Sequence, residues 1–233
     1  RDAYYARNQF AEVFVSLTRA PRSLVARIAG IPGVARAEGR IQQYAILDLP
    51  GSKAPARALI NSIEAGAGSG LNRITLRSGR MPREGETAEV LVDEGFAEAS
   101  GFGPGSRIPA LIYGRRQVLH VVGTGLAPDF VYAIAPGDLI PDSSRFAIVW
   151  TDRTMLEAAT DRTGAINQIA LTLERGAAQA EVIRKVDALL EAYGGSGAYG
   201  REDQISHRFL DNELMQLEAL TRVIPPVFLA VAI

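Results

Sequence analysis

Apolar and polar positions alternate with two different periods along this chain, and these periods predict where strands and helices lie. Residues 10–18 alternate as a strand whose apolar face is formed by Val13, Val15 and Leu17. Residues 21–30 then have helical spacing, with Pro21 suited to a first turn and Gly30 to a helix end. A second strand-like segment, residues 34–49, completes a strand–helix–strand unit.

The same order of elements returns near the other end of the chain. Residues 166–173 alternate as a strand, and residues 177–193 give the clearest helix in the sequence. The apolar face of this helix contains Val182, Ile183, Val186, Leu189, Leu190 and Tyr193. Gly194 and Gly195 suit a left-handed helix end, and residues 198–199 are expected to form a short returning strand.

Two such units pair naturally into one sheet, so the pattern predicts an α+β fold. We expect a ferredoxin-like split βαβ (porter-like) subdomain from residues 8–75 and 160–204, with residues 76–159 as an inserted β-rich subdomain. The inserted elements are predicted as a strand at 89–92, a helix at 94–100, a hairpin of 108–113 with 117–122, a strand at 145–150 and a helix at 155–159. Residues 65–70 are the best candidate loop.

The end of the sequence carries an amphipathic stripe followed by an apolar run. Apolar positions recur at near-heptad spacing in residues 205–224, which predicts an amphipathic helix. Two prolines follow, and residues 227–233 contain no polar side chain. A bilayer span needs about 20 apolar residues, so we interpret residues 225–233 as the start of a truncated membrane helix. The alternative is a terminal strand or helical turn packed in the core. The paired Tyr4 and Tyr5 are typical of a membrane interface.

Composition excludes several classes of function. The 233 residues are 47% hydrophobic and 22% charged, and 25 Lys and Arg against 26 Asp and Glu give a net charge of −1. This balance argues against a nucleic-acid binder, which carries a basic excess. The sequence has no Cys, which excludes disulfides and thiolate chemistry, and its two His are too few for a His-based metal cluster. We therefore expect no metal, no cofactor and no nucleic acid in this chain.

Three short motifs resemble catalytic or phosphate-binding patterns, and each has a simpler structural interpretation. Residues 101–106 are rich in glycine, but a helix precedes them and Pro104 removes an amide, which favours a turn. Residues 194–198 resemble a nucleophile elbow but lack its final glycine and follow a helix, which favours a cap and turn. His207 and Asp211 are spaced to share a helix face, where a solvated pair is the simpler interpretation. We predict no catalytic residue and no enzymatic activity.

Four motifs follow one another in the centre of the chain. They are a Gly-Arg-Met-Pro turn within residues 76–82, a Glu-Val strand at 89–92, a short helix and Gly-x-Gly turn within 97–105, and Val-Val-Gly-Thr at 121–124. With the helix and Ile-Pro-Gly-Val turn of residues 24–34, this order resembles the extracytoplasmic domain of MacB/FtsX-like ABC transporter permeases. The resemblance covers about residues 10–233. Residues 51–71 depart from it, because this loop between the subdomains is longer and richer in glycine.

The resemblance implies a noncatalytic head between two membrane helices, on the periplasmic or extracellular side of the cell (inner) membrane. A separate cytoplasmic ABC ATPase would bind ATP, and the other partners would be a second permease copy, membrane lipid and a periplasmic protein. The head would couple ATP hydrolysis to export or to mechanotransmission. On this interpretation the coupling candidates are Phe209, Leu214, Leu217 and Leu220. The expected turn-forming residues are Gly79, Pro82, Gly103 and Gly105.

Two interpretations from other classes stay open. The chain can be a free-standing periplasmic binding or chaperone module for a hydrophobic ligand or lipoprotein, with Phe130 and Tyr132 lining a cleft. It can also be a hydrolase, which requires Ser196 or His207 to act in catalysis.

Overall fold

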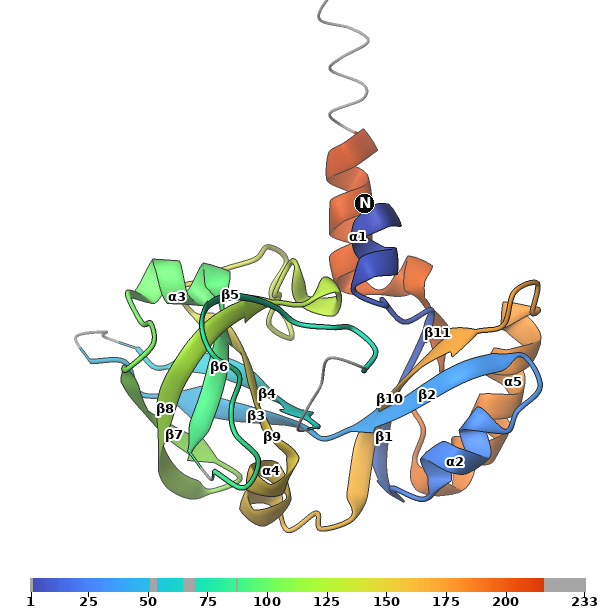
Figure 1. The fold of residues 1–233 in the computed structure, drawn as a ribbon, viewed down its shortest axis with the longest axis horizontal. Coiled ribbons are helices and arrows are strands. Elements are labelled where there is room, and N and C mark those ends of the chain that lie inside the picture. Colours follow the sequence, from blue (N-terminus) through green and yellow to red (C-terminus); the bar gives the residue numbers. More distant parts are fainter. Residues whose placement is uncertain (1, 51–53, 65–69, 87, 216–233) are drawn as a thin grey trace, which may run out of the picture.

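The computed structural model describes residues 2–50, 54–64, 70–86 and 88–215, which form two units, each built around its own sheet. Figure 1 shows the units side by side, with two helical segments rising from between them. No helix in these ranges has the length and apolar character needed to cross a bilayer. Leu217, Leu220 and residues 225–233, for which the sequence made predictions, lie outside the described residues.

The first unit is a four-stranded antiparallel sheet with two packed helices. In sheet order its strands are β11 (Tyr199–Gly200), β1 (Val13–Pro21), β10 (Ala165–Leu173) and β2 (Val34–Arg40). The helices are α2 (Leu24–Ala29) and α5 (Gln179–Leu190). Their shared core contains Val13, Val15, Leu17, Leu24, Ile28, Ile169, Leu171, Val182, Val186 and Leu190. This strand order and the two strand–helix–strand halves confirm the predicted α+β, ferredoxin-like arrangement.

The second unit is a barrel with one additional strand. In sheet order its strands are β5 (Thr75–Gly79), β8 (Arg115–Leu126), β6 (Glu89–Asp93), β9 (Phe146–Asp152), β4 (Ala56–Ile63), β3 (Gln42–Leu47) and β7 (Arg107–Ile112). Because β7 also pairs with β8, the sheet closes on itself. Helices α3 (Glu94–Ser100) and α4 (Arg153–Thr160) contribute Phe96, Met155 and Leu156 to the barrel core.

The boundary between the two sheets differs from the sequence prediction. Residues 34–49 form two strands in different sheets, because the chain passes from β2 to β3 at Ile41. Residues 56–63 form the barrel strand β4, although residues 51–71 had been interpreted as a linking loop. Every residue from 58 to 62 is buried, so this strand shows no alternation of apolar and polar positions. As a result, β3, β4 and β5 lie in the barrel sheet, and of the predicted segment 8–75 only residues before Ile41 contribute strands to the first sheet.

The Gly-Arg-Met-Pro turn depends on a glycine and on an ion pair. Gly79 has φ of 71°, and a Cβ there would lie 2.2 Å from a backbone carbonyl oxygen of β8. Arg80 donates two hydrogen bonds to the carboxylate of Glu89, the first residue of β6. The bonds from Arg80 lower the pKa of Glu89 to about 2, and a hydrogen bond from the Arg83 amide makes a smaller contribution in the same direction. The pair therefore fixes how the chain turns through Pro82 toward β6.

Asp93 joins α3 to the barrel. Its Oδ2 accepts a hydrogen bond from the Phe96 amide at 2.8 Å, which caps the start of the helix. Its Oδ1 accepts one from the Ile148 amide of β9 at 2.6 Å. Burial raises the pKa of this carboxyl to about 6, although the hydrogen bonds act in the opposite direction. The start of α3 is thus set by a side chain that also holds two strands together.

Two helical segments leave the junction of the units together. Helix α1 (Asp2–Arg7) precedes β1, and the short helix η4 (Arg201–Asp203) leads into helical residues 205–215. Figure 1 shows residues 205–215 and α1 running next to each other away from the two sheets. We call residues 205–215 the terminal helix.

Candidate functional site

The two units meet where β2 ends and β3 begins, and side-chain hydrogen bonds hold this crossing. The Ile41 amide donates to Ser62 Oγ of β4 at 2.8 Å. The Gln42 amide donates to Asn167 Oδ1 at 2.7 Å, and Asn167 Nδ2 donates back to the Gln42 carbonyl at 2.8 Å. Asn167 lies in β10, so its amide side chain continues the ladder that the backbone of β10 makes with β2. The crossing is short and is a natural pivot between the sheets.

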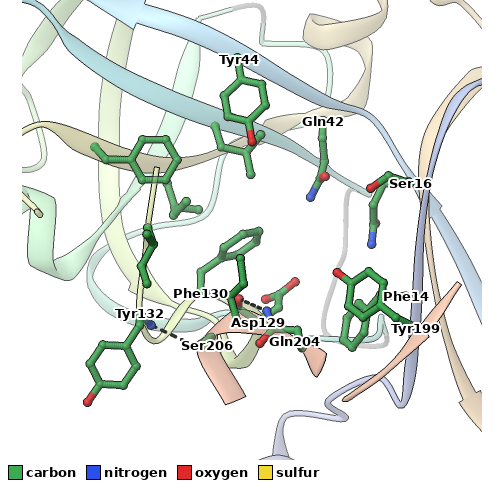
Figure 2. Close-up of a pocket in the computed structure, with 16 residues that line it drawn as sticks. Phe14, Ser16, Gln42, Tyr44, Asp129, Phe130, Tyr132, Tyr199, Gln204 and Ser206 are labelled. Atoms are coloured by element: carbon green, nitrogen blue, oxygen red, sulfur yellow. Dashed lines mark hydrogen bonds between the residues drawn. The ribbon is translucent and has the colours of Figure 1, made fainter. Parts of the chain in front are cut away.

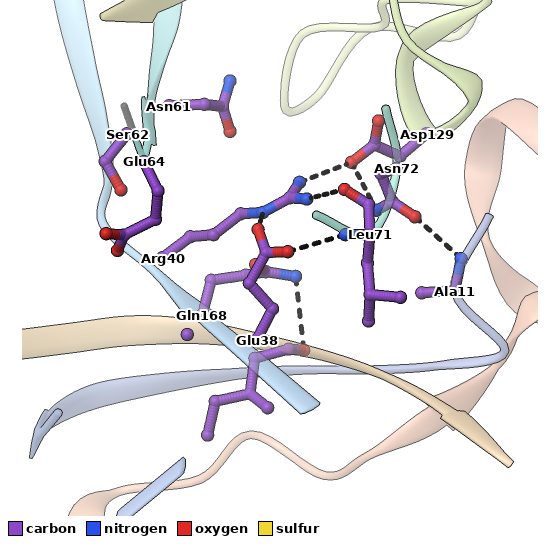
Figure 3. Close-up of polar contacts among 12 residues, drawn as sticks. Ala11, Glu38, Arg40, Asn61, Ser62, Glu64, Leu71, Asn72, Asp129 and Gln168 are labelled. Atoms are coloured by element: carbon purple, nitrogen blue, oxygen red, sulfur yellow. Dashed lines mark hydrogen bonds and ion pairs between the residues drawn. The ribbon is translucent and has the colours of Figure 1, made fainter. Parts of the chain in front are cut away.

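Arg40, the last residue of β2, lies at the centre of this junction. Its side chain is buried and donates to Glu38 Oε1 at 2.7 Å, to Asp129 Oδ2 at 3.2 Å and to the Leu71 carbonyl at 2.5 Å, as Figure 3 shows. The Leu71 amide donates to the other oxygen of Glu38 at 2.7 Å. One guanidinium therefore connects β2 to the segment before β5 and to the loop after β8.

Asp129 lies in the short helix η2 (Pro128–Phe130), and its carboxylate is buried. Its Oδ2 accepts hydrogen bonds from Arg40 and from Asn72 Nδ2, the latter at 2.8 Å, while Oδ1 has no partner within the described part of the chain. Burial raises the pKa of Asp129 and outweighs the opposite effect of Arg40 and Asn72. Burial acts to lower the pKa of Arg40, but the charges and hydrogen bonds of Glu38 and Asp129 together outweigh it, so the pKa is raised. The junction thus contains a desolvated ion pair.

A second buried arginine connects α4 to the same crossing. Arg153 donates to the Gly39 carbonyl of β2 at 2.5 Å and to Glu64 Oε1, just after β4, at 2.6 Å. The exposed Arg22, which follows β1, pairs with Glu64 Oε2 at 2.9 Å. Through Glu64, which pairs with both arginines, charged side chains connect the first sheet to the barrel at a second place beside the crossing.

The base of the terminal helix is bonded to the loop that follows β8. Gln204 Nε2 donates to the Asp129 carbonyl at 2.6 Å, and the Tyr132 amide donates to Ser206 Oγ at 3.0 Å. The rings of Tyr132 and Phe209 lie 5.9 Å apart. The hydroxyl of Tyr132 donates to the carboxylate of Glu213, and this bond raises the pKa of Tyr132 to about 12. A displacement of the terminal helix therefore acts directly on the barrel loop that carries Asp129.

Helix α1 packs against the same base. Tyr5 and His207 share a hydrogen bond of 3.0 Å between the phenol oxygen and Nδ1, and their rings are 5.7 Å apart. The guanidinium of Arg201 lies over the rings of Tyr5 and Phe10, at 5.5 and 4.9 Å from their centroids. Arg201 also donates to the carbonyls of Phe10 and Ala11, at 2.5 and 2.8 Å. The first and last described segments are therefore joined to each other and to the residues just before β1.

A cavity of about 190 Å³ lies between the two sheets, and the base of the terminal helix forms part of its wall. Figure 2 shows its wall, to which β1, β3, β11, the loop after β8 and the start of the terminal helix contribute. Its lining residues are Phe14, Ser16, Gln42, Tyr44, Leu59, Asp129, Phe130, Tyr132, Ile134, Phe146, Ile148, Gln168, Tyr199, Gln204, Ile205 and Ser206. The wall combines aromatic, aliphatic and polar side chains, and Asp129 is the charged residue in this set.

The outer face of the barrel exposes an apolar surface over β3, β7 and β8. Ile46 and Leu111 are paired across β3 and β7, and the paired positions on either side are Arg57 and Arg116. The exposed apolar side chains of this outer face are Tyr44, Ile46, Leu111, Tyr113 and Val118. Two adjacent grooves of about 470 and about 420 Å³ share Ile46 and Leu111. Such a surface is a typical place for a ligand or partner to bind.

The structure brings several sequence-predicted residues to the junction and leaves others elsewhere. Phe130 and Tyr132 line the cavity, and Phe209 contacts Tyr132 from the terminal helix. Leu214 is 39% exposed. Gly105 has φ of 93°, whereas a Cβ at Gly103 would meet open space. The sequence analysis missed Arg40, Asn72, Asp129, Gln204 and Ser206, because contacts between residues so far apart in the chain leave no local pattern.

The hydrolase interpretation requires Ser196 or His207, and these two residues have different neighbours. Ser196 is exposed, and its hydroxyl donates to the Ser16 carbonyl at 2.9 Å. His207 instead contacts Tyr5 at the base of the terminal helix. Among the described residues, no group of three or more His, Asp or Glu side chains is arranged to hold a metal ion. The geometry of the junction is suited to transmitting displacement and to binding a small ligand.

Comparison with known proteins gives a structural likeness at low sequence identity. No protein-family model matches the chain, and no curated protein matches its sequence. The crystal structure of the periplasmic region of MacB from Actinobacillus actinomycetemcomitans is similar, with a TM-score of 0.51 and 10% identity. This match covers 91% of the present chain and 95% of the MacB region. The chain therefore shares the fold of a MacB periplasmic region, which confirms the expected resemblance at the level of the fold.

Two further solved structures align with this chain at lower TM-scores than the MacB region. The extracellular domain of YknZ, a noncanonic ABC-type transporter from Gram-positive bacteria, has a TM-score of 0.48 at 11% identity and covers 82% of this chain and 98% of its own. A domain of a putative permease protein from Porphyromonas gingivalis has a TM-score of 0.43 at 13% identity and covers 80% of this chain and 82% of its own.

Proposed function

We propose that this chain is the noncatalytic extracytoplasmic domain of an ABC transporter permease. In this role it couples ATP hydrolysis in the cytoplasm to export or to mechanotransmission across the cell (inner) membrane. The observation that carries the proposal is the bonding of the terminal helix base to the barrel loop, through Gln204 and Ser206. The fold shared with the MacB periplasmic region supports it.

The proposed mechanism is a lever acting on a pivot. A shift or rotation of the terminal helix moves the acceptor at Ser206 and the donor at Gln204, and the loop bearing Asp129 and Tyr132 moves with them. Asp129 in turn is bonded to Arg40, the last residue before the crossing between the sheets. The barrel then changes its angle to the first sheet as a rigid body, which is a hinge motion of the kind found in many switching proteins.

The proposal also names partners and a location. The motor is a separate cytoplasmic ABC ATPase, and a second permease copy gives the head a twin to move against. Helices flanking this domain connect it to membrane lipid, and the domain lies on the periplasmic or extracellular side. An extracytoplasmic protein is the expected partner where force rather than cargo is delivered. ATP and its chemistry belong to the ATPase, so this chain requires no cofactor.

A distance measurement in the intact permease–ATPase complex tests this proposal without knowledge of the cargo. The chain has no Cys, so Glu98→Cys on the exposed side of α3 provides a single thiol in it for a spin label. We expect the label-to-label distance between the two copies to change when ATP is trapped on the ATPase. Phe209→Asp, which places a charge against the ring of Tyr132, should abolish this change while ATP is still hydrolysed.

The matched control is Met215→Asp, which adds the same charge at a position of the terminal helix that is 56% exposed. This variant should keep the distance change. A distance that does not respond to trapped ATP in the parent complex would refute the proposed function. A response that survives Phe209→Asp would refute the lever.

A second candidate function is favoured by the outer face of the barrel. Two grooves of about 470 and about 420 Å³ fall in the size range of ligand sites, and their shared residues Ile46 and Leu111 are exposed. These features suit a free-standing binding or chaperone module for a hydrophobic ligand or lipoprotein. This second function predicts that the apolar dye 1-anilinonaphthalene-8-sulfonate binds the folded chain. Leu111→Asp should remove most of this dye binding. Unchanged dye binding in Leu111→Asp excludes this face as the site.

A further inference from the structure

The outer face of the barrel carries an excess of positive charge. Its strands β3, β4, β7 and β8 contain no Asp or Glu. Two of their arginines, Arg57 and Arg115, pair with carboxylates from other segments of the chain. Arg107 and Arg116 are exposed, and within the described residues neither pairs with a carboxylate. Asp48, which lines one groove together with Arg116, offsets only part of this charge. An acidic partner would balance the remainder.

The apolar part of the face lies directly beside these arginines. Ile46 is opposite Leu111 across β3 and β7, and Leu111 is opposite Arg116 across β7 and β8. The exposed Tyr44 and Tyr113 line a groove with the same two apolar residues. Tyr and Arg are enriched in the centres of protein interfaces, where Lys and Glu are depleted. The composition of this face is therefore that of a protein-binding surface.

The shape of the face suits a broad partner better than an enclosed small ligand. Small-ligand sites are clefts that bury most of the ligand's surface. Here the grooves of about 470 and about 420 Å³ are walled mostly by side chains that remain exposed. A protein surface can cover both grooves at once and remove Ile46 and Leu111, which the grooves share, from water.

Two other occupants fit this face less well. A second copy of the chain, related by two-fold symmetry, would bring the face against itself and place arginines opposite arginines. Lipid is disfavoured by position. In Figure 1 the terminal helix leaves at the top, whereas β7 lies in the lower half of the barrel. Because the proposed function puts lipid beyond the end of the terminal helix, this part of the barrel lies away from the membrane.

We propose that the outer face of the barrel docks an extracytoplasmic protein, through a surface on which carboxylates border apolar side chains. The partner's apolar side chains cover Ile46 and Leu111, and its carboxylates pair with Arg107 and Arg116. This inference rests on the proposed function, because it names the surface that receives the extracytoplasmic partner of the permease. A protein bound here is displaced whenever the barrel changes its angle to the first sheet.

Site-specific photo-crosslinking tests this proposal in native cells that contain the intact permease–ATPase complex. The photoreactive residue p-benzoylphenylalanine replaces Tyr113, which is 56% exposed on the outer face. The matched control replaces Ala188, an exposed residue of α5 in the first unit. We expect an adduct between this chain and a different, extracytoplasmic protein from position 113, and no such adduct from position 188.

Charge reversal distinguishes the proposed partner from a protein that is merely nearby. Arg116→Glu should lower the yield of the adduct about 10-fold, because like charges then meet at the interface. Arg27→Glu, at an exposed position of α2, is the matched control and should leave the yield unchanged. Arg116→Gln removes the charge without reversing it, so it should give a smaller loss and controls for a folding defect. Replacing the partner's carboxylates near the crosslink with Lys should restore the yield in Arg116→Glu.

The outcomes separate docking from the proposed function. An adduct of two copies of this chain, an adduct with lipid or the absence of any adduct would overturn the docking proposal. A yield that Arg116→Glu does not change would overturn it as well. The distance measurement on the same complex reports independently. A distance that ignores trapped ATP while the adduct still forms refutes coupling alone, and a normal distance change without an adduct refutes docking alone.

Discussion

Replacement of Arg40 is the most direct test of how the junction is held together. Arg40→Leu removes a guanidinium that donates to Glu38, Asp129 and the Leu71 carbonyl, all from a side chain that is 8% exposed. The leucine leaves the Asp129 carboxylate buried without its cation. Breaking a buried ion pair in this way costs about 3–5 kcal/mol. With a urea slope of about 2–3 kcal/mol/M, the midpoint of unfolding should fall by about 1–2.5 M.

The pH dependence of this loss identifies its cause. Burial already raises the pKa of Asp129 in the folded chain, and removal of Arg40 raises it further, because Arg40 acts to lower it. A carboxyl with a raised folded-state pKa favours folding at low pH, and this contribution is lost as the pH rises through the folded-state pKa. The deficit of Arg40→Leu should therefore be largest near neutral pH and should shrink toward about pH 4.

Two further variants complete the experiment, with urea unfolding followed by circular dichroism. Adding Asp129→Asn to Arg40→Leu removes the unpaired charge and should recover about 1–3 kcal/mol. Arg57→Leu breaks an exposed ion pair with Asp138, in which both side chains are more than 40% exposed, and should cost at most about 1 kcal/mol. A loss of less than about 0.5 kcal/mol for Arg40→Leu, or a loss that does not vary with pH, would show that the junction is not desolvated.

Three other predictions follow from single positions. Gly79→Ala should lower the free energy of unfolding by about 3 kcal/mol, while Gly103→Ala should change it by less than about 0.5 kcal/mol, and equal thermal midpoints would contradict the turn geometry. The pKa of Asp93, about 6 instead of 3.8, should make the folded chain about 3 kcal/mol less stable above pH 6 than below pH 3.8 through this group alone; a carboxyl NMR titration with a midpoint near 4 would disprove it. Ser206→Ala should accelerate hydrogen exchange of the Tyr132 amide about 2- to 10-fold, and unchanged exchange would mean that this bond does not hold the loop.

The fold could be predicted where one face of an element is buried and the other is solvated. The first strand and the long helix α5 meet this condition, and their apolar faces lie in the core as expected. Strand β4 does not, since residues 58–62 are buried on both faces and include Asn61 and Ser62. The crossing at Ile41 was also hidden, because no glycine or proline separates β2 from β3. A strand pattern can continue unbroken while the chain moves from one sheet to another.

The candidate site was predictable only in its aromatic part. Phe130 and Tyr132 were identified because large apolar side chains in a loop suggest a binding surface, and both line the cavity. Arg40 and Asp129 could not be paired from the sequence, because 89 residues separate them and each alone resembles an ordinary surface charge. Only the folded arrangement of the two sheets shows that these charges are buried against each other.

The register between β2 and β10 has a consequence for how this architecture can vary. Arg40, where the chain departs from the first sheet, is paired with Gln168, only three residues after the chain returns at Ala165. Entry and exit are thus neighbours on one ladder, close enough for a short hairpin to bridge them. The barrel is therefore an insertion between two strands of an otherwise complete ferredoxin-like sheet. In related or engineered proteins this insertion can be enlarged, shortened or replaced while the strands of the ferredoxin-like sheet keep their pairing.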